Sequence, residues 1–215
     1  MAQPSHDASP WNLPNALTVL RILLVPVFGG MLLAESGANP GQRFAALAVF
    51  LVAMITDRID GELARSRGLV TDVGKILDPI ADKALLGMAF VGLSIIGLVP
   101  WWVTALVLAR EIGVTVVRFV VIRHGVMPAG RGGKVKTFAQ AVALSLLVLP
   151  TWVLPGVQVW RWTAYVVLGV AVALTVVTGL DYLVQAHRLR QTSPRAVAKR
   201  AARAAARAAR GEPRS

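Results

Sequence analysis

Residues 54–83 read MITDRIDGELARSRGLVTDVGKILDPIADK, and this stretch places Asp57, Asp60, Asp78 and Asp82 within a run of 26 residues. The sequence on both sides is apolar over lengths that approach a membrane-spanning helix. A charged side chain is costly inside a bilayer, so carboxylates in such a setting indicate a functional site. The stretch therefore predicts an integral membrane protein with a polar site at or within the membrane.

The composition of the 215-residue chain supports this interpretation. Hydrophobic residues make up 55% of the chain, more than in a typical soluble domain, and they occur in blocks. The chain contains no cysteine, which excludes disulfides, thiolate metal sites and thiol nucleophiles. The net charge of +12 arises mainly after His187, where nine of the 23 Lys and Arg residues lie. Because this charge belongs to one terminus, we expect no nucleic-acid partner.

Six apolar blocks predict an all-α bundle of six transmembrane helices. Most of the blocks reach or approach the roughly 20 residues that a membrane-spanning helix needs, and the fifth is the shortest. Pro100 separates the third block from the fourth, and Pro155 with Gly156 separates the fifth from the sixth. The blocks are residues 13–34, 44–63, 76–99, 101–122, 138–154 and 162–184.

The positions of Lys and Arg indicate the topology, because positive charge in short loops is biased to the cytoplasmic side. Most of these residues fall in the second-to-third loop, the fourth-to-fifth loop and the tail, while the other loops contain only Arg43 and Arg161. We therefore expect a multi-pass protein of the cell membrane with both termini and the aspartates on the cytoplasmic side.

The predicted organisation is a short N-terminal segment (1–12), a six-helix transmembrane catalytic domain (13–187) and a basic Ala/Arg-rich tail (188–215). The tail either lies on anionic membrane lipids or extends into solvent.

The aspartate stretch predicts two helix faces that combine carboxylates with very small side chains. On one helix, the face of Asp57 also carries Asp60, Gly61 and Ala64. On the next helix, a face with four-residue spacing carries Gly74, Asp78 and Asp82. Clustered anions repel one another unless protons or cations intervene. Carboxylate oxygens favour hard divalent cations, so we expect Mg²⁺ or Mn²⁺ as the cofactor rather than Zn²⁺.

The small residues on these faces leave room for a ligand to lie against the helices. Arg65, at the end of the first face, can reach a phosphate that bridges to the metal ions. Helix packing by small residues is the alternative for any one position. It does not account for the whole set of carboxylates, small residues and arginine in two helical registers.

The stretch also resembles a family signature. Read as D(x2)DG(x2)AR(x8)G(x3)D(x3)D, it matches the CDP-alcohol phosphotransferases at every fixed position and spacing. The resemblance implies an enzyme that displaces CMP from a CDP-linked lipid by attack of an alcohol hydroxyl on the phosphate attached to the lipid, and it suggests a homodimer. A Mg²⁺-dependent membrane prenyltransferase and a proton-coupled carrier are the alternatives from other classes, and neither requires the spaced Gly, Ala and Arg positions.

The resemblance also implies roles for individual residues. The expected metal ligands are Asp57, Asp60, Asp78 and Asp82. Asp82 is either the catalytic base that takes the proton of the acceptor or only a fourth ligand. The residues expected to bind the cytidine diphosphate are Asn15, Thr18, Gly61, Ala64, Arg65 and Gly74.

Three shorter stretches indicate the acceptor. They are NLPNALTVLRI (12–22), AREIGVTVVR (109–118) and GKVKT (133–137), and they resemble the phosphatidylglycerophosphate synthases of this family. The resemblance implies CDP-diacylglycerol as donor, sn-glycerol 3-phosphate as acceptor, and phosphatidylglycerophosphate and CMP as products. In the first stretch, Asn15 and Thr18 can alternatively hydrogen-bond between helices, and Arg21 can be structural.

Basic residues independently indicate a phosphorylated acceptor. Arg110 and Arg118 interrupt an apolar helix eight residues apart, and Lys134 and Lys136 approach the membrane from the following loop. Cations within a membrane usually face a partner, and the phosphate of a small dianion would satisfy all four. The structural alternative is an ion pair of Arg110 with Glu111 or with an aspartate, together with lysines that only follow the positive bias of cytoplasmic loops. Within the family, a cardiolipin synthase and a phosphatidylinositol phosphate synthase remain alternative functions.

Overall fold

The computed structural model describes residues 12–66, 71–121 and 131–192. Within these ranges, the description leaves out the side chains of residues 60–65, 72–73, 75–76, 118–121, 131–132, 134 and 186–192. The described chain is built from α-helices and short 3-10 turns and contains no strand, which confirms the all-α prediction. The helices are α1 (Leu13–Leu33), α2 (Pro40–Ser66), α3 (Asp72–Ile95), α4 (Trp101–Val121), α5 (Arg131–Val148) and α6 (Val157–Thr192), with 3-10 turns η1 (Ala34–Gly37) and η3 (Thr151–Val153).

Several helices start earlier than the apolar blocks predicted. Asn39 accepts a hydrogen bond from the backbone N–H of Gln42 at 3.1 Å, and Pro40 occupies the first position of α2, so capping starts this helix before its apolar segment. As a result, Arg43 lies in the first turn of α2 and not in a loop. Lys134 and Lys136 likewise belong to α5 rather than to the preceding loop. Helix α5 ends at Val148, so the predicted fifth segment is shifted toward the N-terminus.

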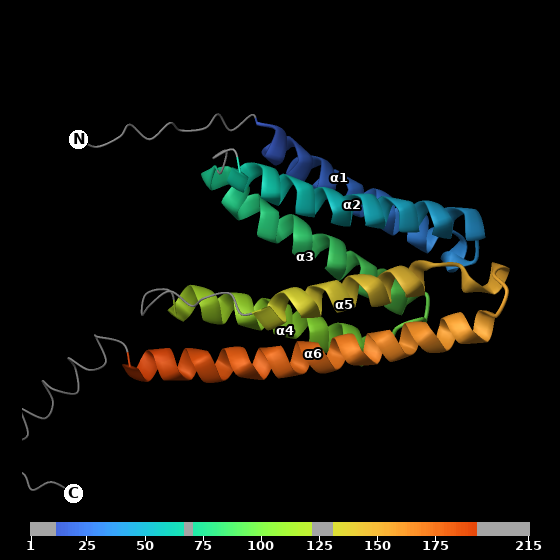
Figure 1. Ribbon diagram of the computed structural model, residues 1–215. Helices are drawn as coiled ribbons and strands as arrows, with labels where there is room; N and C mark the ends of the chain where they lie inside the picture. Colours follow the sequence, from blue (N-terminus) through green and yellow to red (C-terminus); the bar gives the residue numbers. More distant parts are fainter. Residues whose placement is uncertain (1–11, 67–70, 122–130, 193–215) are drawn as a thin grey trace, which may run out of the picture.

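The helices form two groups of three (Figure 1). Helix α1 packs against α2 and α3, while α6 packs against α4 and α5. The two groups meet through α2 with α5 and through α3 with α4 and α5. The start of α1, the end of α2 and the start of α3 lie at the same end of the bundle as the end of α4 and the start of α5 (Figure 1). This end brings the predicted site residues together.

The interior between the first three helices is filled by large apolar side chains. Phe28 of α1 and Phe50 of α2 are fully buried, and their ring centroids are 5.4 Å apart. Leu32, Phe90 and Leu93 belong to the same buried cluster. Burial of side chains of this size contributes about 2 kcal/mol each to folding in water. The cluster fixes the spacing of α1, α2 and α3 on which the site depends.

Two helical stretches within the described residues are long and apolar enough to cross a membrane, namely residues Leu13–Gly37 and Val157–Gln185. Helix α6 carries outward-facing apolar side chains such as Val159, Trp162 and Val166, which are 70%, 64% and 62% exposed. The helices between these stretches contain most of the charged residues of the predicted site, which lowers their hydropathy. The six predicted helices are therefore present, while the number of membrane crossings stays a prediction.

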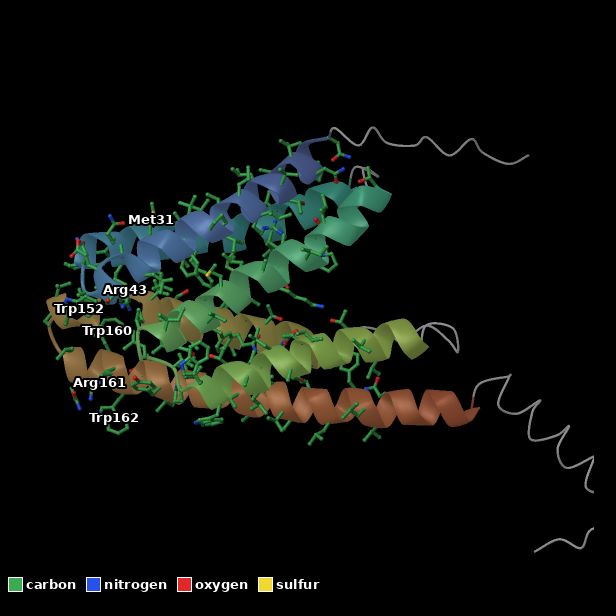
Figure 2. All side chains as sticks on the ribbon, turned by 180° about the vertical axis from the view of Figure 1, so that it is seen from behind. Met31, Arg43, Trp152, Trp160, Arg161 and Trp162 are labelled. Atoms are coloured by element: carbon green, nitrogen blue, oxygen red, sulfur yellow. The ribbon has the colours of Figure 1, made fainter. Side chains whose placement is uncertain are left out.

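At the opposite end of the bundle from the aspartates, Arg43 joins the two helix groups. Its side chain is buried, and its Nε donates a hydrogen bond of 2.7 Å to the carbonyl of Val148. Its terminal nitrogens donate to the carbonyls of Leu147 and Gly37. The guanidinium also lies 5.2 Å from the ring centroid of Trp152, close to it in Figure 2. Arg43 therefore caps the carbonyl end of α5, where backbone acceptors lack helical partners and a positive charge is favourable.

Candidate active site

One face of α1 carries three buried polar side chains, Asn15, Thr18 and Arg21. The helix starts at an N-cap, where the side chain of Asn12 accepts a hydrogen bond of 2.9 Å from the N–H of Asn15. A spacing of three residues keeps the three side chains on one side of the helix. We call these three residues the polar face of α1, and each of them contacts a residue in or beside the aspartate motif.

Arg21 pairs with Asp57 of α2. Its Nη1 lies 2.5 Å from Oδ1 of Asp57, and the side chains are 1% and 38% exposed respectively. The guanidinium is thus enclosed by the protein, while part of the carboxylate faces outward. One oxygen of Asp57 is held in place by a charge-assisted hydrogen bond.

Thr18 makes the corresponding contact with α3. Its hydroxyl donates a hydrogen bond to Oδ1 of Asp78 at 2.7 Å. Thr18 is buried, whereas Asp78 is exposed. As with Asp57, the carboxylate is oriented from the protein side and remains accessible from outside.

Asn15 completes the polar face at the start of α3. Its amide Nδ2 donates to the hydroxyl oxygen of Thr71 at 2.8 Å, and that oxygen also accepts from the N–H of Gly74 at 3.0 Å as the N-cap of α3. A Cβ atom on Gly74 would lie only 2.7 Å from Oδ1 of Asn15. The glycine therefore permits α3 to approach α1 this closely.

The structure thus brings several predicted site residues together on three helices: Asn15, Thr18, Asp57, Gly74 and Asp78. The contacts of Asn15 and Thr18 are hydrogen bonds between helices, the alternative that the sequence left open for them. A role for these two residues in binding cytidine diphosphate stays a prediction. The structure describes only the backbone of four other predicted site residues: Asp60, Gly61, Ala64 and Arg65.

The donor atoms in this region suit a hard divalent cation. Among the described side chains, no group of three or more acidic or histidine residues is close enough to hold a metal ion, and the side chain of Asp60 is not among them. The described carboxylates of Asp57 and Asp78 each have an oxygen held from the protein side and an outward-facing part. Carboxylate oxygens in such an arrangement fit Mg²⁺ or Mn²⁺.

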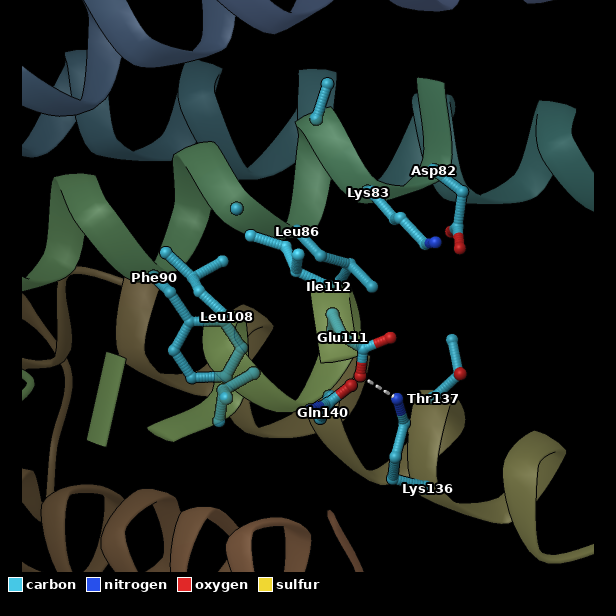
Figure 3. Close-up of a pocket in the computed structure, with 13 residues that line it drawn as sticks. Asp82, Lys83, Leu86, Phe90, Leu108, Glu111, Ile112, Lys136, Thr137 and Gln140 are labelled. Atoms are coloured by element: carbon cyan, nitrogen blue, oxygen red, sulfur yellow. Dashed lines mark hydrogen bonds and ion pairs between the residues drawn. The ribbon is translucent and has the colours of Figure 1, made fainter. Parts of the chain in front are cut away.

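Asp82 lies one helical turn beyond Asp78 and lines a cavity of about 240 Å³ between α3, α4 and α5. Lys83 and Leu86 of α3 form one wall, and Glu111 of α4 lies opposite them with residues of α5 (Figure 3). Polar side chains gather at one end of the cavity, and apolar ones such as Phe90 line the other (Figure 3). The α5 residues of the lining are Lys136, Thr137 and Gln140.

The predicted acceptor-binding cations are placed in two different ways. Lys136 lines the cavity and forms an ion pair with Oε1 of Glu111. Arg110 pairs with the same oxygen at 3.2 Å but extends toward α6, where it donates to the hydroxyl of Thr178 at 2.9 Å and its Cγ packs against Gly179. The Arg110 to Glu111 pair is the structural alternative noted above. The side chains of Arg118 and Lys134 lie outside the description.

Some residues of this region were not assigned from the sequence. The sequence allows a structural role for Arg21, and its position three residues after Thr18 extends a polar face. The sequence indicates Glu111 as a partner of Arg110, and in the structure Glu111 also pairs with Lys136. Lys83 follows Asp82 directly and lines the same cavity, although adjacent residues on a helix usually point in different directions.

Comparison with known proteins places the chain in a family. The CDP-alcohol phosphatidyltransferase family model matches residues 11–203, which span all six helices. The chain belongs to this family. The matched range contains the aspartate stretch, and the match does not support a prenyltransferase or a carrier.

The similar proteins include enzymes of phospholipid synthesis. The chain is 52% identical over 186 residues to a probable phosphatidylglycerophosphate synthase of Mycobacterium tuberculosis, covering 85% of this chain and 87% of that protein. It is 40% identical over 182 residues to the CDP-diacylglycerol--glycerol-3-phosphate 3-phosphatidyltransferase of Bacillus subtilis, covering 80% and 93%. It is also 32% identical over 183 residues to the CMP-forming cardiolipin synthase of Streptomyces coelicolor, covering 83% and 84%.

Proposed function

We propose that this protein transfers the phosphatidyl group of CDP-diacylglycerol to sn-glycerol 3-phosphate, giving phosphatidylglycerophosphate and CMP. The observation that carries this proposal is the similarity, over at least 80% of the chain, to two proteins named for this activity. The arrangement of the polar face of α1 against Asp57 and Asp78 supports it, because two outward-facing carboxylates are held where a metal-bound diphosphate can reach them.

The aspartates are the proposed metal ligands: Asp57, Asp60, Asp78 and Asp82. A divalent ion held there would neutralise the negative charge that develops on the leaving phosphate. The residues proposed to border the cytidine diphosphate are Asn15, Thr18, Gly61, Ala64, Arg65 and Gly74. Arg65 donates to a phosphate oxygen, and the small residues let the diphosphate approach the helix backbones.

Asp82 is the proposed base. It accepts the proton of the acceptor hydroxyl, whose oxygen attacks the phosphorus attached to diacylglycerol, and the bond from that phosphorus to the CMP oxygen breaks. Its position in the cavity lining supports this role, because the acceptor can enter there beside the aspartate motif. Alternatively, Asp82 acts only as a fourth metal ligand. The residues predicted from the sequence to bind the acceptor phosphate are Arg110, Arg118, Lys134 and Lys136. Of the two whose side chains are described, Lys136 lines the cavity and Arg110 extends away from it toward α6.

The proposed setting is the cell membrane, with six crossings and with both termini and the site on the cytoplasmic side. Two apolar helices and the outward-facing apolar residues of α6 support membrane association. The proposed division of the chain is a short segment (1–12), a catalytic domain (13–187) and a basic tail (188–215) near membrane lipids. A homodimer is proposed from the family resemblance.

The test is CMP release by the purified full-length protein with CDP-diacylglycerol and Mg²⁺. We expect release with sn-glycerol 3-phosphate, loss of release in EDTA, and recovery on addition of Mg²⁺ or Mn²⁺. Asp57→Asn and Asp82→Asn should each abolish release while the protein still elutes as a single species. If both variants retained full activity, the catalytic interpretation would be wrong.

A cardiolipin synthase is the second candidate, because one relative at 32% identity is named for that activity. It would use phosphatidylglycerol as the alcohol. The same assay with phosphatidylglycerol or inositol phosphate in place of sn-glycerol 3-phosphate distinguishes the candidates. Release of CMP only with one of these other acceptors would overturn the proposed acceptor.

A further inference from the structure

The cations around the Asp82 cavity differ in how their charge is balanced. Lys136 and Arg110 both pair with Oε1 of Glu111, so one carboxylate already compensates these two side chains in part. Lys136 is almost fully enclosed, with 4% of its side chain exposed. A cation held in this way by a neighbouring carboxylate has less to gain from binding a further anion.

Lys83 is in a different situation. Its ammonium donates a hydrogen bond to the hydroxyl of Thr115, which itself donates to the backbone carbonyl of Glu111 at 2.8 Å. Within the described part of the chain, Lys83 forms no ion pair. Its side chain is partly buried and lines the cavity. A partly desolvated ammonium with a neutral hydroxyl partner is costly, and a phosphate oxygen would compensate its charge.

We propose that Lys83 binds the phosphate of the acceptor in the cavity between α3, α4 and α5. This rests on the function proposed above and adds a phosphate-binding residue that was not assigned from the sequence. The cavity of about 240 Å³ has room for a small phosphomonoester. Lys83 and Asp82 point into the same cavity from α3 (Figure 3), so an acceptor phosphate on Lys83 keeps the hydroxyl of the same molecule near Asp82.

Lys83 and Arg110 differ in where their side chains lie relative to the cavity. Arg110 extends to Thr178 of α6 and lies 6.0 Å from the ring centroid of Tyr182, so it braces α4 against α6. Arg110 does not line the cavity, whereas Lys83 and Lys136 do, from opposite walls. A phosphate placed between these walls would contact Lys83 from α3 and lie beside the Lys136 to Glu111 pair (Figure 3).

The experiment measures kcat and KM for CMP release by the full-length enzyme with sn-glycerol 3-phosphate as the varied substrate. Lys83→Met removes the charge at similar volume. We expect its KM for sn-glycerol 3-phosphate to rise about tenfold or more, because a hydrogen bond to a charged group is lost. The KM for CDP-diacylglycerol should change less than about twofold, since the donor makes no use of this charge.

Thr115→Val is the matched control, because it removes the hydrogen bond between α3 and α4 and keeps the charge of Lys83. If Lys83 only ties the two helices together, the two variants will show the same change. If Lys83 binds phosphate, Thr115→Val will raise the KM less than about threefold. An unchanged acceptor KM in Lys83→Met, or equal changes in both variants, overturns the proposal.

Two further outcomes are interpretable. If Lys83→Met does not fold, Lys83→Gln replaces it; because glutamine also lacks the positive charge, the acceptor KM should rise about tenfold, and an unchanged KM counts against the proposal. If the unmodified enzyme releases no CMP with sn-glycerol 3-phosphate, the proposed function fails first. If the unmodified enzyme releases CMP with sn-glycerol 3-phosphate and Lys83→Met has the same acceptor KM, only the proposed role of Lys83 is refuted.

Discussion

Arg21 and Asp57 form an ion pair in which the cation is enclosed by the bundle and the carboxylate is 38% exposed. The pair joins the polar face of α1 to the first aspartate of the motif. Loss of Asp57 would leave the enclosed guanidinium without its counter-charge, whereas loss of Arg21 would leave a carboxylate that is partly exposed and no longer oriented. Arg21 is therefore placed to orient Asp57 without itself facing the outside.

Replacement of Arg21 by methionine tests this positioning role. We expect Arg21→Met to lower kcat for CMP release about tenfold to 100-fold, in line with the loss of a residue that orients a metal ligand. The concentration of Mg²⁺ that gives half-maximal rate should rise as well. Both quantities come from initial rates at a series of Mg²⁺ concentrations. A change in thermal stability with no change in the Mg²⁺ requirement would indicate a role in folding alone.

Arg43 provides the comparison, because it is also a buried arginine but lies at the far end of the bundle. Arg43→Met leaves the carbonyls of Leu147 and Val148 without their side-chain donor. We expect a loss of about 2 kcal/mol or more in stability from these unsatisfied acceptors. Thermal unfolding followed by circular dichroism measures the loss. Activity per folded molecule should stay within about threefold, and a specific loss of catalysis would contradict this division of roles.

The contact between Thr18 and Asp78 predicts that a variant without the Thr18 hydroxyl requires a higher Mg²⁺ concentration for activity. Thr18→Val keeps the volume but removes the hydroxyl that donates to Asp78. If Asp78 is a metal ligand, the half-maximal Mg²⁺ concentration should rise about tenfold. Thr18→Ser retains the hydroxyl and should stay close to the original value. Equal behaviour of the two variants would mean that the hydroxyl does not orient Asp78.

Gly74 allows a sharper distinction between packing and ligand binding. Gly74→Ala would place a methyl group 2.7 Å from Oδ1 of Asn15, so we expect a loss of about 1–3 kcal/mol in stability and reduced CMP release. Asn15→Ala removes the obstructing oxygen. If the contact between α1 and α3 is the reason for the glycine, the double variant should be more stable than Gly74→Ala.

CMP release by the double variant would stay low if Gly74 instead makes room for cytidine diphosphate. Gly169 of α6 supplies the control, because a Cβ atom there meets nothing within 4 Å. Gly169→Ala should leave activity unchanged and preserve or slightly raise stability, as expected for alanine within a helix. Thermal unfolding and CMP release of the four variants, measured side by side, separate the two explanations.

Helical periodicity predicted the aspartate faces because it depends only on neighbouring residues in the chain. The spacing of Gly74 and Asp78 on α3 follows directly from 3.6 residues per turn. The partners of these faces could not be predicted in the same way. Contacts such as Thr18 with Asp78 join residues 60 positions apart, and their formation depends on the packing of α1 against α3.

Hydropathy predicted the number of helices but not the role of every charged residue. It could not distinguish Arg43 in a loop from Arg43 buried against the end of α5, because both lie at the edge of an apolar segment. Arg110 was similarly predicted from its polarity, while its direction toward α6 depends on how the second group of helices packs. The chain therefore indicates which residues are polar, and the packing determines what each one contacts.

Arg43 joins the two groups of helices at one end of the bundle. The two groups of helices converge at the end where Arg43 binds the last carbonyls of α5, and α3 and α4 separate toward the end that holds Asp82 (Figure 1). The cavity walls formed by α3 and by α4 with α5 belong to different groups. Arg43 therefore holds the two groups together at the end of the bundle where they lie close, and the cavity lies toward the end where they lie farther apart.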